Sequence, residues 1–106
     1  MKFATFILAD VSTAHITQRD AELLESPDAP SRIAALDSLT GERGSPGFVL
    51  SIGNQADHEE RIEVYRRVGF SEEFIAIISE LVRQGIPYVQ FDRDGSVVEG
   101  APVFSW

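Results

Sequence analysis

The most constraining feature of the sequence is one strongly amphipathic stretch between Ser71 and Gly85. Ser71 is a favourable N-cap residue, Glu72–Glu73 lie in the first turn, and the glycine follows where helices commonly end. Between these limits the apolar residues recur at helical spacing: Phe74, Ile75, Ile77, Ile78, Leu81 and Val82. The pattern predicts a helix that packs its apolar face against the rest of the fold.

Two further helices are predicted from their end signals. Thr17–Asp20 has the pattern of a capping box, with Asp in place of Glu, and begins a helix that runs to about Glu25. Another helix is expected over residues 57–68, with Asp57 as its cap and Gly69 in the left-handed position that follows. Both helices are short, so their stability depends on packing.

Four segments predict β-strands: residues 3–9, 47–52, 88–91 and 97–104. The first is apolar or small on both faces, so we expect it to be buried in the centre of a sheet. The second alternates apolar and other residues with a period of two. The last two are separated by Arg93–Ser96, which predicts a hairpin turn.

The predicted order of elements is β-α-β-α-α-β-β in a single domain, residues 1–106. The expected class is α+β: a single mixed sheet of about four strands, with helices packed against it and a C-terminal β-hairpin. Helical crossovers favour parallel pairing of the first strands, and the hairpin favours one antiparallel edge. Residues 27–46 are crowded with Pro, Gly and Ser at both ends and leave open a short turn of helix or a short strand.

Composition limits the classes of function. The absence of cysteine excludes disulfides, thiolate metal sites and a cysteine nucleophile, and it fits a reducing cytoplasm. A net charge of −8 disfavours direct binding of nucleic acid and suits a protein partner with a basic surface. No run approaches the ~20 apolar residues of a membrane span. Residues 1–11 are interpreted as a buried strand, not as a signal peptide.

The segment YVQFDRDGSV, residues 88–97, raises the question of catalysis. A strand followed by Asp92, one residue and Asp94–Gly95 resembles the motif of haloacid dehalogenase phosphatases, in which the first Asp attacks phosphorus and the second acts as acid and base. Only twelve residues follow Asp94, too few for the other motifs of such an enzyme. A calcium loop would need a third acid and a closing Glu. We therefore expect Asp94–Gly95 to supply the positive φ angles of a tight hairpin turn.

A second candidate site follows the first predicted strand. If the first and third predicted strands run parallel, Asp10 and Asp92 lie at the same edge of the sheet, where open α/β sheets bind ligands. A carboxylate could polarise His15, with Ser12 or Thr13 as nucleophile or hydrogen-bond donor. The other interpretation is that Thr13 and His15 cap and order a loop, as short polar side chains often do. The sequence has no G-x-S-x-G motif.

The densest acidic cluster surrounds the middle helix: Asp57, Glu59, Glu60 and Glu63, continued by Glu72 and Glu73. It either imitates a phosphate track for a DNA-binding protein, or forms solvated helix faces whose acids suit helix N-termini. The chain has two histidines, His15 and His58, 43 residues apart, so a zinc site would depend on carboxylates. No metal and no cofactor are expected.

Two segments carry a family resemblance: VSTAHIT (residues 11–17), followed by Asp20, and YVQFDRDG (residues 88–95), followed by Gly100 and a terminal Trp106. Together they resemble a family of small bacterial proteins of unknown function, whose members often occur on plasmids, phages and integrated elements. Residues 27–70 depart from its pattern. The resemblance implies an accessory protein of a mobile element. Small acidic proteins of such elements are often inhibitors of host defence, including CRISPR and restriction systems.

Three hypotheses follow. The favoured one is a non-enzymatic mobile-element protein that binds a basic protein surface, as an anti-CRISPR or anti-restriction inhibitor would. It is favoured because each candidate nucleophile, metal set or phosphate loop is incomplete. The second is a small-ligand or hydrolytic site formed by Asp10, Thr13, His15 and Asp92. The third is an oligomeric module, such as a homodimer, that uses Trp106 and the last predicted strand.

Overall fold

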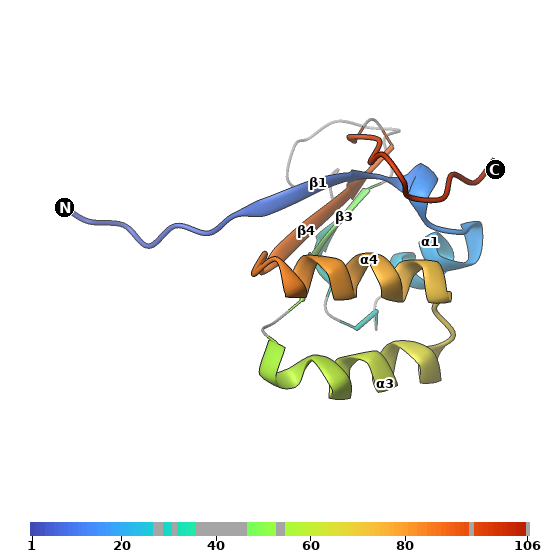
Figure 1. Cartoon of the computed structure of the whole chain (residues 1–106), viewed down its shortest axis with the longest axis horizontal. Coiled ribbons are helices and arrows are strands. Elements are labelled where there is room, and N and C mark those ends of the chain that lie inside the picture. Colours follow the sequence, from blue (N-terminus) through green and yellow to red (C-terminus); the bar gives the residue numbers. More distant parts are fainter. Residues whose placement is uncertain (27–28, 31, 36–46, 53–54, 94, 106) are drawn as a thin grey trace.

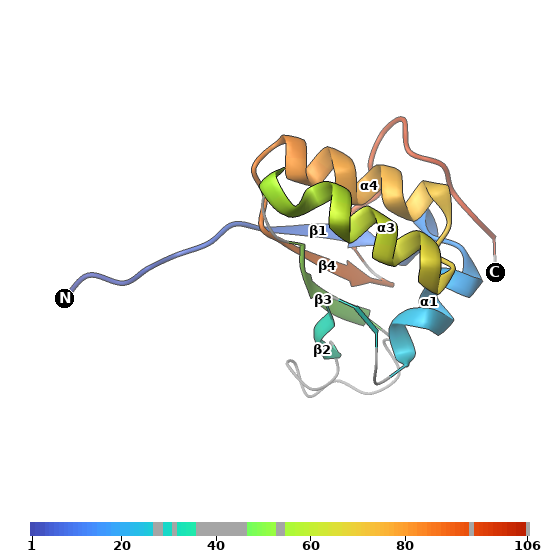
Figure 2. The same ribbon diagram turned by 90° about the horizontal axis from the view of Figure 1, so that it is seen from below.

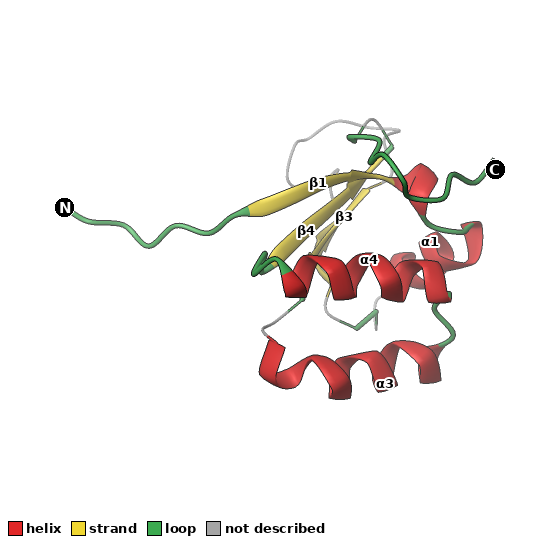
Figure 3. Cartoon of the chain, in the orientation of Figure 1, coloured by secondary structure: helices red, strands yellow, loops and turns green. Residues whose placement is uncertain are grey.

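The computed structural model describes residues 1–26, 29–30, 32–35, 47–52, 55–93 and 95–105. In this part of the chain, a mixed four-stranded sheet has the order β1-β4-β3-β2, with helices packed against it (Figures 1 and 3). The elements are β1 (Leu8–Ser12), η1 (Thr13–His15), α1 (Gln18–Glu25), β2 (Arg32–Ala35), β3 (Gly47–Ser51), η2 (Gln55–Asp57), α3 (His58–Val68), α4 (Glu72–Arg83) and β4 (Tyr88–Asp92). The predicted α+β class with a single mixed sheet is confirmed.

Strand β4 lies between β1 and β3 in the sheet. It runs parallel to β1 and antiparallel to β3, and β3 in turn pairs antiparallel with β2. The parallel alignment of the first strand with residues 88–91, which was the condition for the candidate site at Asp10 and Asp92, is present. The expected parallel pairing of the first strands, residues 3–9 and 47–52, is wrong, because β4 lies between β1 and β3 and runs antiparallel to β3 (Figure 2). Strand β2 confirms the short-strand alternative for part of residues 27–46, of which residues 36–46 lie outside the described chain.

The first strand differs from its prediction. It covers Leu8–Ser12, not residues 3–9, and it lies at the edge of the sheet, not in its centre. Phe3, Phe6 and Ile7 are 75%, 69% and 68% exposed. The reason is the length of its partner: Leu8 pairs with Tyr88, the first residue of β4, so the residues before Leu8 have no strand beside them.

The helix ends follow the local signals. The backbone N–H of Asp20 donates to Thr17 Oγ1 and the N–H of Thr17 donates to Asp20 Oδ2, both at 3.0 Å, which completes the predicted capping box. Gly69 ends α3 with φ of 113°, as expected. Asp57 occupies the N-cap position of α3, but its side chain makes no capping hydrogen bond there.

The core lies between the sheet and α4. Phe91 and Val89 of β4 stand opposite Phe48 and Leu50 of β3, and all four are buried. Helix α4 buries the predicted apolar stripe: Phe74, Ile75, Ile78, Leu81 and Val82. Helix α3 runs along α4 but buries only Tyr65, so most of its surface faces solvent (Figure 1).

The C-terminal segment does not form the predicted hairpin. The backbone N–H of Gly95 donates to the carbonyl of Asp92 at 2.9 Å, so the expected turn exists, but the described residues 95–105 contain no strand. Strand β4 has β1 and β3 on its two sides, which leaves no free edge for a returning strand. The segment instead crosses the end of β1, where the N–H of Phe104 donates to the carbonyl of Ala14 at 2.7 Å.

Gly95 has a different role from the one expected. Among the glycines that the structure describes, those with positive φ are Gly69, Gly85 and Gly100, and Gly95 is not one of them. A Cβ atom at Gly95 would lie 2.7 Å from the carbonyl carbon of Val11, well inside van der Waals contact. The glycine is therefore required by close approach of the turn to the backbone of β1, not by a left-handed backbone. Asp94 and Trp106 lie outside the described residues.

Candidate functional site

The two predicted aspartates lie at different levels of the sheet: Asp92 ends β4, at the edge formed by the carboxyl ends of β1 and β4, whereas Asp10 lies in the middle of β1 and not at its carboxyl end as expected. The parallel register places Ser12 opposite Asp92 and Asp10 opposite Gln90. The Nε2 atom of Gln90 donates to Asp10 Oδ1 at 3.0 Å, and the hydroxyl of Ser96 donates to Asp10 Oδ2 at 3.4 Å. The carboxylate of Asp10 thus binds an amide and a hydroxyl in this arrangement.

His15 is fully buried at this edge, and both of its ring nitrogens contact the C-terminal segment. Nδ1 lies 2.6 Å from the carbonyl oxygen of Pro102, and the backbone N–H of Val98 donates to Nε2 at 2.8 Å. A carbonyl only accepts and an N–H only donates, so we assign the hydrogen to Nδ1 and the lone pair to Nε2. His15 therefore ties residues 98–102 to the loop after β1.

The residues beside His15 also have structural roles. The hydroxyl of Ser12 accepts from the backbone N–H of Ala14 at 3.1 Å and so caps η1. Thr13, which is half-buried, begins this short helix. Of the two interpretations given by the sequence, the ordering of a loop is the one that these contacts support.

Two pockets adjoin this edge. A pocket of about 300 Å³ is lined by Ser12, Thr13, Ala14, Arg93 and Phe104. A larger one, of about 580 Å³, lies between β1, α4 and residues 98–102 and is mostly apolar. Neither pocket was predicted, because each depends on the path of the C-terminal segment. From the sequence, Arg93 was assigned to a turn and not to a site, and the position of its charge next to the strand end was the signal available.

The acidic residues of the other candidate site lie on α3 and just before it. Asp57, Glu59, Glu60 and Glu63 are all exposed. The ion pairs found among the described residues join Arg19 to Glu22, Arg66 to Glu72, and Arg83 to Glu80, and so involve none of these four acids. The four carboxylates therefore meet solvent and are not neutralised by a base in the described part of the chain.

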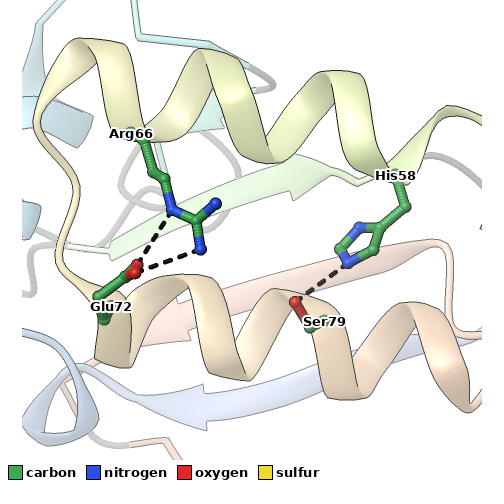
Figure 4. A network of polar contacts seen from close by, with 4 residues as sticks. All are labelled: His58, Arg66, Glu72 and Ser79. Atoms are coloured by element: carbon green, nitrogen blue, oxygen red, sulfur yellow. Dashed lines mark hydrogen bonds and ion pairs between the residues drawn. The ribbon is translucent and has the colours of Figure 1, made fainter.

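Two polar contacts hold α3 against α4 (Figure 4). Nε2 of His58 lies 3.0 Å from Ser79 Oγ near the start of α3. Near its end, Arg66 donates from Nε and Nη2 to the carboxylate of Glu72, at 3.4 and 3.2 Å. One contact near each end fixes how α3 presents its outer surface. Within the described residues, no three His, Asp or Glu side chains are grouped closely enough to hold a metal ion.

Asp20 is a residue whose full role the sequence did not reveal. Its carboxylate is completely buried and, beyond the capping box, accepts from the backbone N–H of Ser71 at 2.8 Å and from the Ser71 hydroxyl at 2.5 Å. Sequence spacing can indicate a local cap, but not a contact with a residue 51 positions away. These bonds position the start of α4 and are structural.

Fold and site together define a small α+β domain with a four-stranded mixed sheet and a helix, α3, whose three glutamates are exposed and which also carries three arginines. None of the helices in the described part of the chain is both long and apolar enough to cross a membrane. Residues 8–106 match the C-terminal domain of the family of unknown function DUF5983, and the chain belongs to this family. Comparisons with curated proteins and with solved structures give no match.

Proposed function

We propose that this domain acts by binding a protein with a basic surface, through the exposed acids Asp57, Glu59, Glu60 and Glu63. The observation that carries the proposal is the state of these carboxylates, which are exposed and take part in none of the described ion pairs. Charges left without an internal partner are available to complement a partner's charges.

The way in which α3 is held on α4 supports the same proposal. The helix contributes one buried side chain, Tyr65, and is fixed on α4 by the pairs His58–Ser79 and Arg66–Glu72. A surface that is already ordered loses little conformational entropy when it binds. The net charge of −8 would also accelerate encounter with a basic partner by electrostatic steering.

The resemblance of the S-T-A-H-I and F-D-x-D-G segments to proteins of plasmids and phages extends the proposal. The partner would then be a basic, nucleic-acid-binding surface of a host defence system, and the domain an inhibitor of the anti-CRISPR or anti-restriction type. In that role the acids of α3 would occupy the site of a phosphate backbone.

The test uses three immobilised baits in a bacterial lysate: the native chain, the variant Glu60→Lys/Glu63→Lys, and the control Glu22→Lys/Glu99→Lys. Both variants change the net charge equally, from −8 to −4 (−8 + 2 + 2), and all four glutamates are exposed. A partner that uses α3 is captured by the native chain and the control, is lost with the α3 variant, and is released by salt. Capture that is equal for all three baits contradicts the proposal.

A second candidate function is binding of a small ligand at the carboxyl ends of β1 and β4. It is favoured by the parallel register, which places Ser12 opposite Asp92, and by the adjoining pocket of about 300 Å³ with Thr13 and Arg93 in its lining. A fragment screen followed by backbone amide NMR shifts tests it. Fragments that bind this pocket should shift the amide resonances of Thr13 and Phe104, and Arg93→Ala should weaken their binding. A screen that gives no shifts at these two amides argues against the site.

A further inference from the structure

Residues 1–7 form an exposed arm that leads away from the domain (Figures 1 and 2). The arm is apolar, and its large side chains are Met1, Phe3, Phe6 and Ile7, each more than two-thirds exposed. Phe6 contacts the ring of Tyr88 edge-on, at 5.6 Å between centroids. Exposed apolar residues gathered in one continuous segment commonly mark an interaction site.

The arm continues an edge strand in phase with its core-facing residues. Side chains alternate along a strand, so Phe3 and Ile7 share the parity of Ala9 and Val11. Val11 is buried in the core and Ala9 packs against it, whereas Phe3 and Ile7 are exposed. The arm therefore has a core-type face with no layer to cover it in this chain.

A groove of matching character runs beside the same strand. The pocket of about 580 Å³ lies along β1, and its apolar lining includes Ala9, Val11, Ala76, Ile77 and Leu81. Strand β1 pairs with β4 on one side, and on its other edge the N–H of Ser12 donates to the carbonyl of Ser96 at 3.0 Å. The backbone of Leu8–Asp10 has no hydrogen bond on this edge to the described residues, and an unpaired strand edge is a template for another strand.

The arm of the same chain does not suit its own groove. To fold back on β1 it would need a tight turn within residues 4–8, Ala-Thr-Phe-Ile-Leu, which contain no Gly, Asn, Asp or Pro.

We propose that two copies of this chain exchange arms in a closed two-fold dimer. The arm of each copy adds as an antiparallel strand to the open part of the outer edge of the partner copy's β1, at Leu8–Asp10, and places Phe3 and Ile7 in the groove beside α4. A two-fold arrangement makes both contacts at once, because each copy offers one arm and one groove. The proposal uses other residues than the acidic surface of α3 and stands independently of it.

Sedimentation equilibrium over about 1 µM to about 1 mM tests the proposal with exposed positions only, so that folding is retained. The arm variant is Phe3→Asp/Ile7→Asp and the groove variant is Ala76→Arg. The control Val64→Asp/Val97→Asp places the same added charge at exposed valines outside the groove. The native chain and control should dimerise, and either variant should weaken the dimer more than about a hundredfold, because two apolar side chains per arm lose their burial.

Mixing the two variants gives the sharper result. A heterodimer contains one intact arm in one intact groove, so native mass spectrometry should detect more heterodimer in the mixture than homodimer in either variant alone. A native chain that stays monomeric throughout overturns the proposal, as does a dimer that survives the arm variant. A ladder of larger species overturns the closed arrangement, since arms passed in one direction would form open chains.

Discussion

The carboxylate of Asp20 accepts hydrogen bonds from both the backbone N–H and the hydroxyl of Ser71, at 2.8 and 2.5 Å. The same carboxylate caps α1 through the N–H of Thr17, and the Ser71 hydroxyl caps α4 through the N–H of Phe74. One buried side chain therefore joins the starts of two helices.

Replacement of Asp20 by Ala should lower the free energy of unfolding by about 2–4 kcal/mol, because it leaves donors of the half-buried Thr17 and Ser71 without their acceptor. The control Glu22→Ala, at an exposed position of the same helix, should change it by less than about 0.5 kcal/mol. Urea denaturation measures both. Equal stability of the two variants would show that the carboxylate of Asp20 does not stabilise the contact between the starts of α1 and α4.

His15→Leu should release the C-terminal segment. The substitution removes the bonds to Pro102 and Val98 and should cost about 1–3 kcal/mol of stability. Hydrogen exchange of the Val98 amide, followed by NMR, should accelerate at least about tenfold, because this N–H loses its acceptor. The control His58→Leu removes a contact on α3 and should leave that amide protected. Unchanged protection in His15→Leu would contradict the assignment.

Gly95→Ala should destabilise the domain by about 1–3 kcal/mol, because the new methyl group meets backbone atoms of Val11 and Ser12 that cannot move independently of β1. The neighbouring change Ser96→Ala, at an exposed residue, should have less than about 0.5 kcal/mol of effect. Thermal or urea unfolding distinguishes them. If Gly95→Ala and Ser96→Ala have equal stability, the close approach to β1 is not the reason for a glycine at position 95.

The pKa of the Glu80 carboxyl should lie well below the ordinary value of a glutamate. Hydrogen bonds from Arg83 and then Gln84 lower its pKa from 4.5 to about 2. A lowered folded pKa adds stability above the unfolded value near 4.5, and this is lost as the pH falls towards 2. Both partners are on the surface, so the energy is small. NMR titration of the Glu80 carboxyl measures the midpoint.

In this titration Arg83→Ala should raise the midpoint of Glu80 towards 4.5, and Gln84→Ala should raise it less. Arg67→Ala, on α3, serves as the control and should leave it in place. A midpoint that does not respond to Arg83 would exclude the guanidinium as the cause.

Helix positions could be predicted because their signals are local. The capping box at Thr17, the cap at Ser71 and the left-handed Gly69 each act within one turn of helix, so a short stretch of sequence contains the whole interaction. The apolar stripe of α4 likewise indicates which face is buried. The pairing of the strands could not be predicted in this way: the helical crossovers favoured parallel pairing of the first strands, whereas β1 pairs with β4 and residues 47–51 run antiparallel to β4.

The sequence by itself therefore determined the helices, the strand at residues 47–51 and the strand at 88–92, since their patterns of caps and apolar residues are complete within each segment. Only the tertiary structure decided that β1 lies at an edge, that His15 holds residues 98–102, and that Asp20 reaches Ser71. These contacts join residues 51 or more positions apart, and many partners of similar chemistry compete for each one. The choice among them is made by packing of the whole chain, which no local pattern contains.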